Sequence, residues 1–435
     1  MRPHLLAAVT ALTACASSPY DRAWLAREIH AHTGAAARPE GSGTTARLPP
    51  ATSFDDGLTE DEAAAIALWN SPSFQSDLAQ LGFARADLAD AGMLPNPVLS
   101  LLFPIGPRQF ESWLSWPIEV LWQRPHRVEA ARLDVARVAQ GLVQSGLDLA
   151  RDARVAHADA VLAGAREGVR AEAAATLAEI ASLAGRRSAA GDLADSDVAA
   201  ARLEAGIAAE AASRAVADRV AARARLALTL GLPDLADGAT LAPGAASDEA
   251  PGALVVLVQT ALAARPDVRA AEIAVEAAGA RAGWERSRIL SVSVRADVFG
   301  GGGAPELSGR VGPQVTLPIF QQNQGGVGRA QAEAERALWR LALARQQVVA
   351  EVTTARASLA QSRAALRTWR ADVLPAADEA LRGARQAFER GDASYLVVLD
   401  ATRRQLDARL REAELLAESR RAEAQLVRST GGRHG

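Results

Sequence analysis

Proline is missing from two long stretches of this sequence, and its absence limits the folds that the chain can adopt. No proline lies between Pro125 and Pro233, and after Pro318 the sequence has only Pro375. Because proline interrupts helices, each stretch can hold a helix much longer than the roughly 20 residues usual in globular proteins. We predict two long helices and two return helices, at about 126–190, 327–390, 195–231 and 395–430. The return helices carry narrow apolar seams at helical spacing, which favours a curved wall of helices over a compact globule.

These stretches belong to a unit that occurs twice, because short landmarks recur about 200 residues apart. The landmark pairs are Ser71-Pro72 with Arg265-Pro266, Trp116-Pro117-Ile118 with Leu317-Pro318-Ile319, and Gly191-Asp192 with Gly391-Asp392. We predict a first repeat at 58–232, a linker at 233–252 and a second repeat at 253–435. Each repeat begins with a shorter helix, at about 58–91 and 253–286, and Thr59 with Glu62 forms a capping box at the start of the first.

Polar and apolar residues alternate in two segments of each repeat, between the shorter helix and the long helices. We predict strands at about 97–104, 110–122, 289–299 and 306–320. Segments of about ten residues with two unlike faces are typical of transmembrane β-strands. In that case the lumen-facing residues are Ser291, Ser293, Arg295, Asp297, Ser308, Arg310, Gln314 and Thr316. The lipid-facing residues are Leu114, Trp116, Ile118, Val120, Leu290, Val292, Val294, Val311 and Val315. The alternation alone is equally compatible with an ordinary antiparallel sheet over a soluble core.

The first residues favour the membrane interpretation of these strands. Residues 1–15 have Arg2, then a mostly apolar run, and end in Leu12-Thr13-Ala14-Cys15. This order is typical of a lipoprotein signal peptide, in which Cys15 is acylated and becomes the mature N-terminus. The alternative is an ordinary signal peptide cleaved near Ala16, with Cys15 discarded. Residues 16–57, rich in Ala, Gly, Ser, Thr and Pro, are then expected to form a tether.

Transmembrane strands would also require several copies of the chain. Four strands cannot close a barrel, and an open sheet edge is not tolerated in lipid. Two copies would give a small barrel filled by its own side chains, whereas three copies give twelve strands and room for a lumen. A channel therefore needs at least three copies.

Several other functions lack support in the sequence. The net charge is −3 and no basic patch or arm occurs, so nucleic acid is not an expected partner. Among the six histidines only His30 and His32 are close together, and both fall in the expected tether, so no metal site is predicted. No nucleophile motif of the G-x-S-x-G type is present. We expect no enzymatic activity and no cofactor, apart from the covalent lipid on Cys15.

Two repeats of helix, β-hairpin and long helical hairpin behind a lipobox resemble the outer-membrane factor family typified by TolC. The resemblance covers about 58–430, and its local motifs are Asn96-Pro97, Leu317-Pro318-Ile319-Phe320, Leu374-Pro375-Ala376-Ala377 and the run from Phe388 to Ser394. It implies a mainly α protein with a membrane β-barrel part. In such a fold, a homotrimer forms a 12-stranded β-barrel that is continuous with a periplasmic α-helical barrel. It also implies a lipid anchor in the outer membrane and a body that extends into the periplasm.

The resemblance assigns roles to the turns between the long helices and the return helices. The turns at Gly191 and Gly391, with Asp392 and Ser394, would contact a periplasmic adaptor (membrane fusion protein). Asp197, six positions after the first turn glycine, would line the periplasmic gate, with Asp195 and Asp192 beside it. Alternatively, Asp192 or Asp195 simply caps the return helix. The second turn departs from the family pattern, because Val397 replaces the acidic residue and Ala393 replaces a basic latch residue.

The function implied by the resemblance is the outer-membrane exit duct of a tripartite efflux system. The duct would passively conduct drugs or metal ions delivered by an adaptor and an inner-membrane resistance-nodulation-division pump. Two alternatives remain open from the sequence: an exit duct for type I protein secretion, and a periplasmic coiled-coil scaffold or adaptor without a pore. The sequence does not indicate which substrate passes.

Overall fold

The computed structural model describes most of the chain. The described residues are 17–38, 46–50, 52, 54, 56–103, 110–233, 239–243, 250–300, 308–390 and 392–432. They form two compact units, and each unit combines segments of both repeats. Unit 1 comprises Met1–Leu25, Ser76–Leu142 and Pro266–Gln346, and unit 2 comprises Ala26–Gln75, Val143–Arg265 and Gln347–Gly435. Long helices contribute to both units, so the units do not follow the repeat boundaries.

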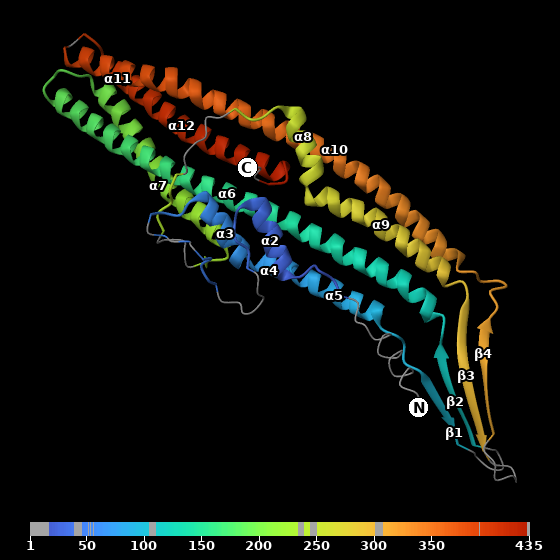
Figure 1. The fold of residues 1–435 in the computed structure, drawn as a ribbon. Helices are drawn as coiled ribbons and strands as arrows, with labels where there is room; N and C mark the ends of the chain where they lie inside the picture. Colours follow the sequence, from blue (N-terminus) through green and yellow to red (C-terminus); the bar gives the residue numbers. More distant parts are fainter. Residues whose placement is uncertain are drawn as a thin grey trace. The chain divides into compact units, whose positions relative to one another are not determined.

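Unit 1 contains one four-stranded antiparallel sheet. Its strands are β1 (Val98–Leu102), β2 (Phe110–Pro117), β3 (Ser291–Gly300) and β4 (Ser308–Thr316), in the spatial order β1-β2-β3-β4 (Figure 1). Since β2 pairs with β3, the hairpins of the two repeats join into a single sheet.

The second strand is shorter than the sequence predicts. After Pro117 the chain bends, and the amide of Gln123 donates to Glu119 O at 3.0 Å, the spacing of a helix. Helix α6 (Val120–Ala189) therefore begins where the strand was expected to continue. The prediction that Val120 faces lipid from a strand is wrong, because Val120 is a buried helix residue, 6% exposed. The side chains at 118, 120 and 122 fit an alternating pattern, but such a short apolar run does not distinguish strand from helix.

Prolines divide the shorter helices that precede the sheet strands. The segment 58–91 contains α3 (Glu60–Asn70), α4 (Pro72–Asp77) and α5 (Ala79–Gly92), and the segment 253–286 contains α8 (Leu254–Ala264) and α9 (Pro266–Ser287). The breaks at Ser71 and Arg265 each precede a proline, which lacks the amide hydrogen and disfavours a helical residue before it. The break at Leu78, between α4 and α5, has no proline beside it. The capping box is confirmed, since Glu62 N donates to Thr59 Oγ1 and Thr59 N donates to Glu62 Oε2.

The long helices also differ in detail from the prediction. Helix α6 pairs with α7 (Asp195–Leu230), and α12 (Tyr395–Ser429) returns along the second hairpin. The helix expected at 327–390 consists of α10 (Gln324–Thr368), a π-helical turn at Trp369–Val373, and α11 (Leu374–Glu389). Pro375 is the second residue of α11, just after the π-helical turn, and the wider turn makes room for a proline that cannot donate a backbone hydrogen bond. Trp369 Nε1 donates to Ala408 O at 2.9 Å, which fastens this turn to α12.

The expected tether is partly folded. Helix α2 (Arg22–Thr33) lies inside it, and Ile29 in unit 2 is almost fully buried. Ile29 packs against α6 at Gly146, where an added Cβ would lie 3.0 Å from the isoleucine side chain. Arg154 of α6 donates to Thr33 O at 3.2 Å. The sequence analysis missed this helix, because its few buried apolar residues, such as Leu25 and Ile29, stand among small residues.

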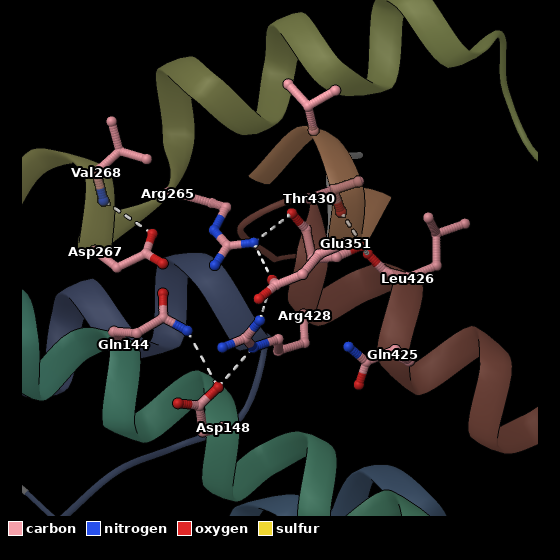
Figure 2. Close-up of polar contacts among 12 residues, drawn as sticks. Gln144, Asp148, Arg265, Asp267, Val268, Glu351, Gln425, Leu426, Arg428 and Thr430 are labelled. Carbon is pink, nitrogen blue, oxygen red and sulfur yellow. Dashed lines mark hydrogen bonds and ion pairs between the residues drawn. The ribbon is translucent and has the colours of Figure 1, made fainter. Parts of the chain in front are cut away.

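An ion-pair network in unit 2 joins three helices to the end of α8 (Figure 2). Arg265 follows α8 and is fully buried, and its Nη1 lies 2.5 Å from Glu351 Oε2 of α10. Arg428 of α12 forms a second ion pair with Glu351. Its Nε also donates to Asp148 Oδ1 of α6 at 2.6 Å. One carboxylate thus binds two arginines that come from opposite ends of the second repeat.

Candidate functional site

The strand register sorts the predicted sheet residues onto two faces. Facing positions on paired strands share a face, and Ser291, Ser293 and Asp297 lie opposite Thr316, Gln314 and Arg310. Arg295 and Ser308 fall on the same polar face. Leu114 and Trp116 lie opposite Ala296 and Val294, on the other face together with Val292, Val311 and Val315. Ile118 and Leu290 lie just outside the strand ends, so their assignment to a strand face differs from the structure.

Charged groups cluster on the polar face. Asp297 accepts hydrogen bonds from Arg295 Nε at 2.6 Å and from Arg310 Nε at 3.1 Å. The guanidinium carbon of Arg295 lies 4.8 Å from the centre of the Trp113 ring, which is a cation–π contact. This layer of the sheet therefore carries two arginines for one aspartate, a composition suited to an aqueous surface.

The opposite face is apolar and open. Val311 is 75% exposed, and Leu99, Leu101, Leu114 and Val315 are also exposed. The outer edges of β1 and β4 have no paired strand among the described residues. A sheet with an uncovered apolar face and two free edges needs further molecules to cover it, because such surfaces otherwise aggregate.

The first hairpin turn contains the three predicted gate aspartates. Gly191 has φ +85°, and Asp192 N donates to Arg187 O at 2.9 Å, which together form a Schellman turn at the end of α6. Asp192 and Asp195 are exposed, and Asp197 is half-buried. Ser188 Oγ donates to Asp195 Oδ1 at 2.8 Å. The N-cap of α7 is Ala194, which has no side-chain cap bond, so neither Asp192 nor Asp195 caps this helix.

The second hairpin turn repeats the same backbone bond. Asp392 N donates to Ala387 O at 2.8 Å, and Asp392 Oδ2 lies 3.4 Å from Arg390 Nε. Ser394 is the N-cap of α12 without a side-chain cap bond. Gly391 lies outside the described residues, as does Cys15.

Aromatic residues that the sequence analysis missed join the two hairpins near these turns. Phe388 and Tyr395 contact each other edge-to-face, with 6.4 Å between ring centres, and Arg187 of α6 lies 4.2 Å above the Phe388 ring. Tyr395 packs into a cluster with residues of α6 and α7, namely Leu177, Ala184, Val198 and Ala201. Burial raises the pKa of the Tyr395 hydroxyl, and nearby Glu204 adds to the shift. The sequence signal that could have indicated this cluster is the pair Phe388 and Tyr395, one on each side of the second hairpin turn.

None of the helices in the described segments is both long enough and apolar enough to cross a membrane. In the same segments, no three His, Cys, Asp or Glu side chains come together in a way that could hold a metal ion.

Comparisons with known proteins show which proteins the chain is similar to. The sequence profile of the family "Outer membrane efflux protein" matches residues 257–432, which lie in the second repeat. Over this repeat the chain is similar to the family. The cobalt-zinc-cadmium resistance protein CzcC of Cupriavidus metallidurans is 27% identical over 384 residues, covering 86% of this chain and 90% of the relative.

Solved structures show that the fold extends over both repeats. The outer-membrane channel OprN superposes with a TM-score of 0.74 at 21% identity, covering 96% of this chain and 99% of that chain. The outer membrane protein VceC of Vibrio cholerae gives a TM-score of 0.73 at 20% identity, covering 86% and 96%. The predicted mainly helical, TolC-like fold is thereby confirmed.

Taken together, these matches show a channel component of an efflux system and not an enzyme. It acts in the outer membrane and extends into the periplasm. This favours a channel over the alternative of a periplasmic scaffold without a pore. The roles of individual strand and turn residues stay predictions.

Proposed function

We propose that this chain is the lipid-anchored outer-membrane exit duct of a tripartite efflux system whose cargo is divalent metal cations. Three copies would assemble, with the sheets of unit 1 forming one barrel. The observation that supports the barrel is the sheet itself, which has one polar face, one open apolar face and two unpaired edges. Three such sheets satisfy every edge in a closed wall.

In this barrel the charged face around Asp297 would line the lumen, and the face around Val311 would contact lipid. The polar face carries two arginines and one aspartate, and placing these charged side chains in hydrocarbon would cost much free energy. The orientation with this face toward the lumen is therefore the favourable one. Cys15 would carry the lipid anchor. Metabolic labelling with palmitate tests this assignment: the wild-type chain should be labelled, and Cys15→Ser should not.

The hairpin turns would form the periplasmic end of the duct and contact the adaptor of a resistance-nodulation-division pump. Asp192, Asp195 and Asp197 would give nine carboxylates around the mouth of a trimer, which would concentrate cations there. The relation to CzcC, whose name states resistance to cobalt, zinc and cadmium, favours metal cations over drugs. A type I secretion duct would share the fold, so the cargo must be tested directly.

Deletion of the gene is expected to lower the growth-inhibiting concentrations of zinc, cobalt and cadmium several-fold, because these cations would accumulate inside the cell. The wild-type gene restores resistance. Inhibitory concentrations of drugs, together with the amount of secreted protein, serve as the comparison. If the deletion leaves metal sensitivity unchanged and increases drug sensitivity, the cargo is drugs rather than metal cations. If metal sensitivity is unchanged and a secreted protein is lost, the cargo is a protein.

Asp197→Ala is expected to weaken the block of single channels by multivalent cations in planar bilayers about tenfold, a loss of about 1.4 kcal/mol of binding free energy. The carboxylate is half-buried at the first turn of α7, close to the mouth of the proposed duct. Asp218→Ala removes an exposed carboxylate from the same helix, away from the turn, and serves as the control. Equal block in wild type and Asp197→Ala would remove the gate assignment.

A further inference from the structure

A cavity in unit 2 lies where four parts of the chain meet. Helix α3 contributes Glu60 to its lining, α6 contributes His157, α12 contributes Arg420, and the linker between the repeats contributes Pro243. The atom-free space is about 420 Å³, and part of this volume is the open mouth of the cavity. The enclosed part therefore suits a ligand of one ring rather than a drug-sized molecule.

The walls of this cavity are apolar and made largely of small side chains. Helix α6 lines it with Ala158 and Ala165, and α12 lines it with Ala413 and Ala417. An alanine presents a single methyl group, so helices that meet through alanines leave shallow walls without protruding side chains. A flat apolar ring can contact such walls on both of its faces and gain dispersion energy from each.

The two charged residues of the lining neutralise each other. Arg420 Nη1 donates to Glu60 Oε1 at 3.0 Å, and the two side chains are only 10% and 21% exposed. Burial raises the pKa of the Glu60 carboxyl, and the ion pair with Arg420 opposes this shift. A charged ligand would lose its hydration here without gaining an unpaired counter-charge, so the cavity favours a neutral molecule.

His157 supplies a hydrogen-bond acceptor to the cavity. The residue is 2% exposed, and its Nε2 lies 2.7 Å from Leu58 O. Burial lowers the pKa of the imidazole, although the bond to Leu58 O opposes the shift, so the ring is neutral near pH 7. A carbonyl oxygen can only accept, so Nε2 carries the hydrogen and Nδ1 carries a lone pair. Within the described part of the chain, Nδ1 bonds to no other residue.

We propose that this cavity binds a neutral, flat aromatic molecule of the phenol class. The hydroxyl group of the ligand would donate to His157 Nδ1, and the ring would lie between the alanines of α6 and α12. A buried acceptor without a donor is unfavourable, so the ligand satisfies a group that the chain leaves unpaired. This inference goes beyond the proposed duct and depends neither on its cargo nor on trimer formation.

Isothermal titration of the full chain in detergent with phenol tests the site, with the detergent buffer alone as the blank. We expect saturable binding of one phenol per chain, with a Kd on the order of 0.3 mM for so small a ligand. Toluene has a methyl group in place of the hydroxyl group and is the matched ligand. It should bind about tenfold more weakly, because it leaves Nδ1 unpaired.

Ala165→Phe should block the cavity without overpacking the core, because Ala165 is an exposed residue of the lining. We expect this variant to bind phenol at least tenfold more weakly than the wild type. Ala175→Phe places the same side chain at an exposed position of α6 outside the lining, and its Kd should stay within twofold of the wild-type value. Equal binding by these two variants would overturn the inference.

Substitution of His157 tests the polar contact. His157→Leu should lose the preference for phenol over toluene, whereas His157→Gln should keep most of it, because an amide can donate to Leu58 O and still offer an acceptor oxygen. An unchanged preference in His157→Leu would remove the role of Nδ1. A wild-type chain that unfolds cooperatively but binds no phenol would overturn the whole site. The metal-sensitivity and trimer measurements test the duct separately from this site.

Discussion

Val311→Arg is expected to remove the trimers of this protein from the outer membrane. Val311 is 75% exposed in the single chain, and an exposed substitution normally changes stability by no more than about 0.5 kcal/mol. On the lipid face of a barrel, however, an arginine near the middle of the bilayer costs about 2–4 kcal/mol. Each trimer has three such positions, so the cost is on the order of 10 kcal/mol per trimer. Trimer yield on unheated gels of outer-membrane fractions measures the effect.

Gln314→Arg is the matched control for this experiment. Gln314 is exposed on the same strand, and the register places it opposite Ser293 on the polar face. An arginine there would meet water in the lumen and should leave the trimer yield close to that of the wild type. Wild-type assembly of Val311→Arg, or equal loss in both variants, would show that the apolar face does not contact lipid.

Glu351→Ala is expected to destabilise the helical part of each chain by about 3 kcal/mol, the low end of the cost of breaking a buried ion pair, because the Glu351 side chain is itself 34% exposed. The substitution leaves Arg265, whose side chain is 1% exposed, without the carboxylate that its Nη1 contacts at 2.5 Å. Arg428 loses the same partner and keeps Asp148. Arg265 keeps its bond to Ser429 O, but the buried guanidinium loses a carboxylate partner where water has little access (Figure 2).

The shift of the urea midpoint, followed by far-ultraviolet circular dichroism in detergent, measures this loss. Glu351→Gln keeps an acceptor oxygen and should cost less than Glu351→Ala. Glu379→Ala on α11 removes an exposed carboxylate with no partner among the described residues, and we expect less than about 0.5 kcal/mol for it. A midpoint for Glu351→Ala equal to that of Glu379→Ala would mean that the network does not stabilise the fold.

Local patterns account for the parts of the fold that the sequence predicts well. The turn at Gly191 needs a left-handed backbone, which glycine adopts readily, and the structure has φ +85° there. The faces of β3 and β4 follow from alternation, because successive strand residues point to opposite sides. Both features depend on neighbouring residues alone. The same local reasoning failed at Val120, where a short apolar run fits a helix as well as a strand.

The candidate site was predictable in its parts but not in its contacts. Asp297 and Arg310 were both expected on the polar face, but the sequence does not show that the aspartate is bound by two arginines. The cluster of Arg187, Phe388 and Tyr395 was missed, because its members come from hairpins about 200 residues apart. Helix α2 was missed because only a few apolar residues stand in a segment of small ones.

The sequence by itself determined long proline-free helices, two-faced strands and a duplicated order of elements, because each is encoded by residues near one another in the chain. The tertiary structure alone decided that β2 pairs with β3, that Glu351 binds Arg265 and Arg428, and that β1 and β4 are the outer strands of the sheet. These contacts join distant segments, and their partners are selected by shape and charge when the elements pack. No local periodicity specifies such a choice.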